Sequence, residues 1–232
     1  MLGLSQDRVA ITANFDGSRI LVFGAVKREQ PIPAGEPLQV VVAISGPSTP
    51  LVVRRKARRF GIWVNTDSVR VDAAPSFYAV ATSGPFEKVL TNVEDLRHRI
   101  SIERAIRSVG AAVSAEGVHD YIDALIRIRK QEGLYRIVEN AVSVDEQTLF
   151  RTAIDMPANL TEGSYATRIF LTRGGHVVSK FETAIDVRKV GLERWLYMLS
   201  REQPLIYGLM SLAIAIAAGL GASSLFRLLR ER

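Results

Sequence analysis

The sequence predicts a mainly β protein, an immunoglobulin-like β-sandwich with a two-helix insertion, followed by a C-terminal transmembrane helix. Three observations predict this architecture. Short apolar runs alternate with turn-forming residues at the spacing of about 8–12 residues that is typical of sandwiches and barrels. A central stretch instead repeats its apolar residues at helical spacing. Near the end of the chain, no charged residue occurs between Glu202 and Arg227.

The composition is that of a folded protein with one membrane-length segment. The chain has 232 residues, of which 47% are hydrophobic and none is cysteine. This hydrophobicity argues against a disordered chain, and the lack of cysteine excludes a disulfide scaffold or thiolate metal site. Of the net charge of +6, the tail at 227–232 (three Arg and one Glu) holds +2. The remainder is small for a nucleic-acid-binding protein, so no nucleic acid is expected as a partner.

Six short strands are expected before the helical stretch. Each is rich in β-branched or aromatic residues, and Gly, Pro, Asp and Ser separate them. The expected strands are Val9–Ala13, Arg19–Phe23, Leu38–Ile44, Leu51–Val53, Phe60–Val64 and Phe77–Val80.

A basic run at 54–59 continues the fourth of these strands. It contains five Lys or Arg residues and one Ala. One interpretation is a contact with phosphate or anionic lipid. The other is an edge strand whose charges keep further strands from adding to it. Strand alternation places Arg54, Lys56 and Arg58 on one face and Arg55 and Arg59 on the other, and this split favours the edge strand.

Residues 86–133 form the expected helical insertion. Apolar residues recur at helical spacing in its first half and again over Asp120–Lys130, and Gly133 stands where a helix C-cap glycine belongs. The segment 111–117 is expected to connect the two helices. The arginines of this insertion could form an oxyanion site for sulfite or a sulfonate, or could lie on exposed helix faces. They are Arg97, Arg99, Arg104, Arg107, Arg127 and Arg129.

Four strands are expected after the insertion, at Val142–Val144, Thr148–Ile154, Ser164–Leu171 and Val177–Val187, with a tight turn at Gly174–Gly175. Four strands alone would bury too little to stand comfortably by themselves. One sandwich domain over residues 1–190 is therefore the simplest assembly. Tyr165 resembles the corner tyrosine of immunoglobulin-like domains, whose hydroxyl bonds to nearby backbone.

The segment 203–226 is the expected transmembrane helix. Its 24 residues would span about 36 Å, more than a hydrocarbon core of about 30 Å. An interfacial amphipathic helix is expected at 191–202, and a basic tail at 227–232. Aromatic and arginine residues mark the membrane boundaries, and glycines could allow a second copy of the chain to approach. These anchor residues are Trp195, Tyr197, Tyr207, Gly208, Gly219, Gly221, Arg227 and Arg230.

Charge predicts the orientation of this span. The compact arginine tail favours a cytoplasmic C-terminus. The chain begins with Met1–Asp7, which lacks the basic and apolar regions of a secretory signal. Two alternatives follow: a tail-anchored protein with its domain in the cytoplasm, or a true start that lies upstream.

Several segments resemble a family of transmembrane proteins of alphaproteobacteria that has no assigned activity. They are Ile11–Gly17, Leu21–Ala25, Leu134–Arg136, Met156–Leu160, Gly163–Tyr165, Val187–Gly191 and Pro204–Leu209. The resemblance covers nearly the whole chain. It implies a leader upstream of this sequence, an inner-membrane location and a periplasmic domain. It also implies a permease of the sulfite-exporter type as a possible partner.

No nucleophile elbow or phosphate-binding loop occurs in the sequence. His119 and Asp120 could approach one another on a helix, but a metal site needs three or four convergent ligands. We therefore expect no metal, no cofactor and, on balance, no catalysis. The sequence favours a binding or scaffold module for a membrane partner. An accessory oxyanion-binding protein or enzyme is the alternative.

Overall fold

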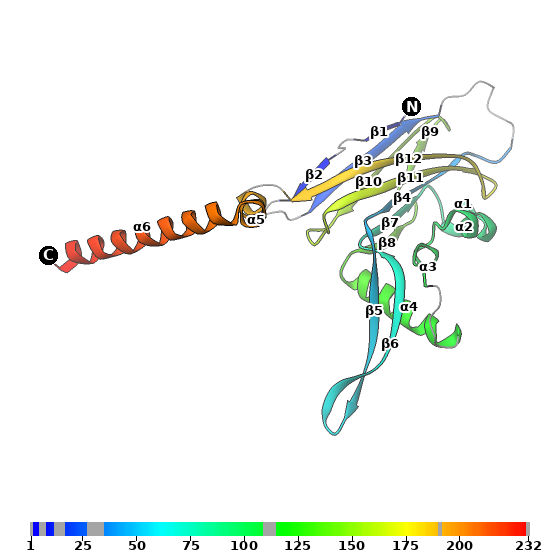
Figure 1. Ribbon diagram of the computed structural model, residues 1–232. Helices are drawn as coiled ribbons and strands as arrows, with labels where there is room; N and C mark the ends of the chain where they lie inside the picture. The colour runs from blue at the N-terminus through cyan, green and yellow to red at the C-terminus, as the bar shows by residue number, and fades with distance from the viewer. Residues whose placement is uncertain are drawn as a thin grey trace. The chain divides into compact units, whose positions relative to one another are not determined.

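Figure 1 shows the computed structural model, which is described over residues 2–4, 8–11, 17–26, 35–108, 115–189 and 192–230. Strands make up 48% of it and helices 30%. The predicted mainly β fold with a C-terminal apolar helix is therefore confirmed. The chain divides into two units, one comprising Met1–Val9 and Phe15–Arg188 and the other comprising Ala10–Asn14 and Lys189–Arg232.

The described strands form three sheets. The first has the order β1-β3-β10-β9, with β1 at Leu2–Leu4, β3 at Ser18–Ala25, β10 at Leu149–Met156 and β9 at Ser143–Asp145. The second has the order β2-β12-β11-β4-β7-β8, with β2 at Arg8–Ile11, β12 at His176–Lys189, β11 at Gly163–Arg173, β4 at Gln39–Ser45, β7 at Tyr78–Thr82 and β8 at Tyr135–Val138. The third is a hairpin of β5 (Ser48–Arg59) and β6 (Ile62–Pro75).

The first sheet covers the core with one face. Along β10, exposed and buried residues alternate without exception, and Ile154 and Met156 are among the buried ones. This period of two is typical of a strand with one face on the core and one in solvent. The sheet therefore forms an outer layer of the sandwich.

Two neighbouring strands of the second sheet, β4 and β7, are covered on both faces. In β4 the run Val40–Ile44 is buried at every position. The sequence of a strand is a continuous apolar run when both of its faces lie against other elements. The first sheet lies on one side of these two strands, and the helical insertion lies on the other. Tyr165 donates its hydroxyl to the backbone oxygen of Thr161 at 2.7 Å, which is the bond expected of a corner tyrosine.

The helical insertion differs in detail from the two helices expected. The described residues of the insertion form four helices, namely α1 (Phe86–Val89), α2 (Asn92–His98), α3 (Ile102–Ala105) and α4 (Ala115–Gln131). Leu90 is extended after α1, Arg99 is left-handed after α2, and Ile106 is extended after α3. These three residues divide the first expected helix. Of the expected connection at 111–117, residues 115–117 belong to α4, and 111–114 lie outside the described residues.

Most expected strands are present, with three differences. β1 and β8 were not expected, and β6 is much longer than the strand expected at Phe60–Val64, whose first two residues form a turn instead. Residues 12 and 13 of the first expected strand lie outside the described part of the chain.

The described residues of the second unit form two helices, α5 (Leu192–Glu202) and α6 (Pro204–Arg230). The window Pro204–Gly221 of α6 is apolar and long enough to cross a membrane, and none of it is buried against other residues. Among the described residues it is the one helix with these properties. This confirms the expected apolar span. The helix α5 covers the residues at which the interfacial helix was expected.

Candidate functional site

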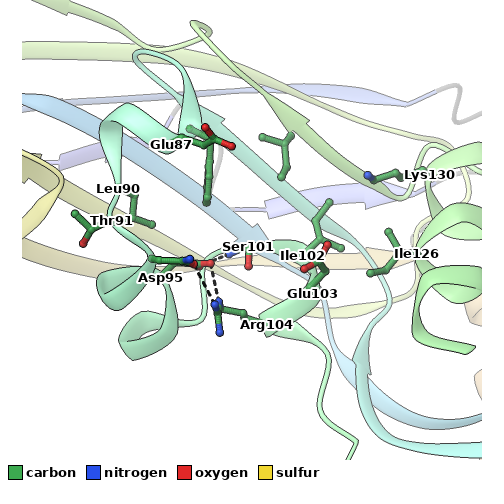
Figure 2. A pocket seen from close by; sticks show the side chains of 13 residues that line it. Glu87, Leu90, Thr91, Asp95, Ser101, Ile102, Glu103, Arg104, Ile126 and Lys130 are labelled. Atoms are coloured by element: carbon green, nitrogen blue, oxygen red, sulfur yellow. Dashed lines mark hydrogen bonds and ion pairs between the residues drawn. The ribbon is translucent and has the colours of Figure 1, made fainter. Parts of the chain in front are cut away.

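A hollow of about 660 Å³ lies beside the helical insertion. Of the six arginines considered for an oxyanion site, Arg104 alone lines it. Figure 2 shows Arg104 turned toward Asp95, whose carboxylate it reaches at 2.9 Å. Arg104 also donates to Asn92 at 3.1 Å. Its guanidinium is therefore already held by neighbouring groups.

The Asp95 carboxylate is itself fully used by the fold. It accepts hydrogen bonds from the backbone N–H of Ile100 at 3.0 Å and of Ser101 at 2.7 Å. These donors lie where α2 ends and α3 begins, so that Asp95 fixes the turn between the two helices. Asp95 is 5% exposed, and a buried carboxylate requires such partners. The Asp95–Arg104 pair therefore stabilises this turn, and no ligand is needed to account for it.

The other five arginines lie apart from this hollow. Arg97 pairs with Glu94 at 3.0 Å, and Arg129 pairs with Glu132 at 3.3 Å. Arg99 and Arg107 are exposed, and Arg127 lines a second hollow of about 540 Å³. The described hollows thus do not bring the six arginines together.

The charge of the first hollow is also poorly suited to an oxyanion. Its lining includes the acids Glu87, Asp95 and Glu103 and the bases Arg104 and Lys130. Recognition of an oxyanion relies on donors whose positive charge is free to meet it. Here the acids outnumber the bases, and one base is already paired.

Arg168 of β11 joins the insertion to the second sheet and was not anticipated from the sequence. It donates to the backbone oxygens of His98 at 2.8 Å and Arg99 at 3.0 Å, at the C-terminal end of α2. It also donates to the hydroxyl of Tyr78 at 2.9 Å. A cation at a helix C-terminus satisfies orphan carbonyls and complements the helix dipole. The role of Arg168 is therefore structural.

The β5–β6 hairpin is a different kind of feature, and we call residues 54–66 the arm. Figure 1 shows the hairpin extending from the sandwich as a two-stranded ribbon. At its base, Val69 and Val71 are buried, and Arg107 exchanges backbone hydrogen bonds with Ala73. Beyond this base every arm residue is exposed or half-buried. Arg54–Arg59 alone would extend about 20 Å at 3.3 Å per residue.

The turn of the arm has strained backbone geometry. Arg59 pairs with Ile62, which leaves Phe60 and Gly61 as a two-residue loop. Both have positive φ, +49° and +84°, as a type I′ turn requires. Asn or Gly is the usual first residue of such a turn, and a bulky residue there is a genuine outlier. The side chain of Phe60 is nevertheless fully exposed.

The arm combines exposed apolar residues with a one-sided charge. Phe60, Ile62 and Trp63 are 105%, 64% and 69% exposed. Residues 54–66 contain five Lys or Arg and no Asp or Glu. The register places Trp63 directly opposite Arg58 and Ile62 opposite Arg59. Large apolar side chains left in water beside cations are typical of an interaction surface.

The sequence favoured an edge strand for this basic run. In the structure this run pairs with β6, with a shift of register between Arg55 and Lys56. The sequence did not indicate that the neighbouring Phe60–Val64 segment would form the turn and return strand of the same ribbon. Both faces of the arm carry cations, so that alternation does not argue against binding.

The anchor residues of the sequence analysis fall on α5 and α6. Tyr197 and Tyr207 are exposed, and the Arg201 guanidinium lies 5.8 Å from the ring centre of Tyr197. A methyl group added at Gly208, Gly219 or Gly221 would meet no atom within 4 Å. Three further anchor residues lie in these helices, and the structure does not describe their side chains. They are Trp195, Arg227 and Arg230.

A β-sandwich with one exposed membrane-length helix defines the chain as a membrane-anchored, mainly β protein. The sequence matches the family described as "Putative transmembrane protein (Alph_Pro_TM)" over residues 1–228, and the chain belongs to that family. No curated protein matches it.

Proposed function

We propose that this chain is a single-pass, membrane-anchored binding module that docks on a membrane partner through the arm. In this proposal α6 crosses the inner membrane, the tail is cytoplasmic and the sandwich is periplasmic. The partner is the bilayer or a protein within it, such as the permease that the family resemblance implied. No catalysis is assigned.

The observation that carries the proposal is the exposed tip of the arm. Phe60, Ile62 and Trp63 are large apolar side chains in water. Burying such a side chain in an apolar environment gains about 1.5–3 kcal/mol, and a monomer gains nothing by displaying three of them together. A docking surface accounts for their exposure, and the buried base at Val69 and Val71 gives it a fixed support.

The alternative function, an accessory oxyanion-binding protein, has weaker support. It would need several free arginines around one hollow. Arg104 is paired with Asp95, and Arg97 and Arg129 are paired with glutamates. No described observation favours sulfite or sulfonate binding over the docking role.

The docking proposal is tested by photo-crosslinking in intact cells. A photoreactive amino acid replaces Phe60 at the tip, and in a control replaces Gln131, an exposed residue at the end of α4. We expect adducts with membrane lipid or a membrane protein from position 60 and none from position 131. Equal adduct formation at both positions, or none at position 60, would contradict a docking role for the arm.

A further inference from the structure

We propose that the arm binds the headgroup layer of an anionic bilayer, with Phe60, Ile62 and Trp63 at the acyl boundary and the five cations among the headgroups. This inference rests on the docking function proposed above and names the chemistry that the arm recognises. It assigns the arm to a lipid surface in preference to a protein.

The charge of the arm fits an anionic surface. Arg54, Arg55, Lys56, Arg58 and Arg59 all lie on the distal part of β5. The nearest acid on the paired strand is Asp67, which faces Arg55 at the inner end of the arm. The negative surface potential of anionic lipid attracts clustered Lys and Arg side chains.

The positions of the apolar residues fit the same surface. The three exposed side chains follow one another around the turn, at the outermost point of the ribbon. Trp and Phe on an apolar face, with Lys and Arg beside them, are the composition of segments that lie in the membrane interface. The long stems of Arg58 and Arg59 can remain near the apolar region while their charged ends stay with the phosphates.

The strain at the tip supports a functional reason for the aromatic residue. Phe60 occupies a left-handed position with φ of +49°, where Asn or Gly would be favoured. Strained backbone often accompanies functional sites. An insertion role for the ring explains why an aromatic residue stands at this position.

The fluorescence of Trp63 tests the proposal in the full-length chain. The chain has two tryptophans, so Trp195→Phe leaves Trp63 as the only one. The protein is placed in lipid nanodiscs, and vesicles of the same lipid are added so that the arm can meet either bilayer. The lipid is brominated phosphatidylcholine, alone or mixed with brominated phosphatidylglycerol. Bromine quenches the indole only when Trp63 enters the bilayer.

We expect quenching in the anionic mixture, little in phosphatidylcholine alone, and its loss at high salt. Removing two charges with Arg58→Gln and Arg59→Gln should weaken the response about 30-fold, and the matched pair Arg127→Gln and Lys130→Gln less than about twofold. Equal effects of the two pairs, or no quenching from either bilayer, would overturn the proposal. Protein adducts at position 60 without quenching would overturn lipid binding and retain the docking function.

Discussion

The guanidinium of Arg168 and the hydroxyl of Tyr78 meet at 2.9 Å, and together they fasten the helical insertion to the second sheet. Tyr78 in turn donates to the backbone oxygen of Ile100 at 2.8 Å. The two residues are far apart in the sequence but lie on neighbouring parts of one sheet face. Together they bind the backbone oxygens of His98, Arg99 and Ile100, where α2 ends.

Loss of Arg168 should therefore loosen the insertion. Arg168→Met would leave the oxygens of His98 and Arg99 without this donor. Hydrogen bonds to charged groups contribute about 1.5–3 kcal/mol, so we expect a loss of about 2–3 kcal/mol in the free energy of unfolding. Hydrogen exchange should also accelerate in α2 before the β strands. Arg151→Met, at an exposed position of β10, is the control and should change stability by less than about 0.5 kcal/mol.

Two buried tyrosines should make the domain sensitive to alkali. Burial raises the pKa of Tyr78 to about 12 and that of Tyr135 to about 12, from an ordinary value of 10.0. Because the unfolded chain loses these protons first, stability should be constant below about pH 10 and fall as the pH rises toward about 12.

Each tyrosine would contribute on the order of 2 kcal/mol to this fall. Urea unfolding at about pH 9 and pH 11.5 measures it. Tyr135→Phe lowers stability at both pH values by removing the bond to the Pro75 oxygen, but it should reduce the difference between them. If Tyr135→Phe left the difference in stability between the two pH values unchanged, the pKa of Tyr135 would not be raised in the folded state.

The strain at the arm tip predicts a stabilising substitution. Phe60→Asn would create the Asn-Gly pair that type I′ turns prefer, and we expect a gain of about 1 kcal/mol in the free energy of unfolding. The same change at Phe181, an exposed residue within β12, should instead be neutral or destabilising. A loss of stability in the Phe60→Asn variant would contradict the strain argument.

Acidic residues at mid-span should prevent membrane retention. Ala215→Asp and Ala217→Asp should each cost about 2.5–3.5 kcal/mol on insertion scales, so that the double variant moves to the soluble fraction or is degraded. Ala215→Leu with Ala217→Leu is the control and should stay in the membrane. Unchanged resistance of the acidic variant to alkaline extraction would mean that another segment holds the protein there.

The sequence alone predicts those strands in which burial selects a regular pattern of apolar residues. The alternation in β10 and the continuous apolar run in β4 are both visible in the residues, because core contact selects them. β6 was missed beyond Val64 because Asn65–Ser68 are polar, as residues of a ribbon with two exposed faces can be. The early helices were merged in the prediction. The break after α2, for example, depends on Arg168, which is distant in the sequence and donates to the backbone oxygens of His98 and Arg99.

The candidate site was only partly predictable for the same reason. The five cations of the arm were evident in the sequence, and lipid binding was one of two interpretations. The decisive feature is that Phe60 and Trp63 lie on the same ribbon as those cations, and this depends on the register of a hairpin. The arginines of the insertion suggested a site by composition alone, and their pairing with Glu94, Asp95 and Glu132 depends on the folded helices.

We propose above that α6 crosses the inner membrane with the sandwich in the periplasm and the tail in the cytoplasm. Each Arg of the tail that moved across an energised membrane would cost about 2.3 kcal/mol per 100 mV. The chain has no cysteine, so single cysteines report position without background. Cells with a permeabilised outer membrane are treated with a membrane-impermeant maleimide. We expect Gln131→Cys, at the exposed end of α4 and outside the arm, to be labelled at once and Glu231→Cys in the tail only after lysis of the inner membrane. Labelling of Glu231→Cys in unlysed cells, or protection of Gln131→Cys, would contradict this orientation.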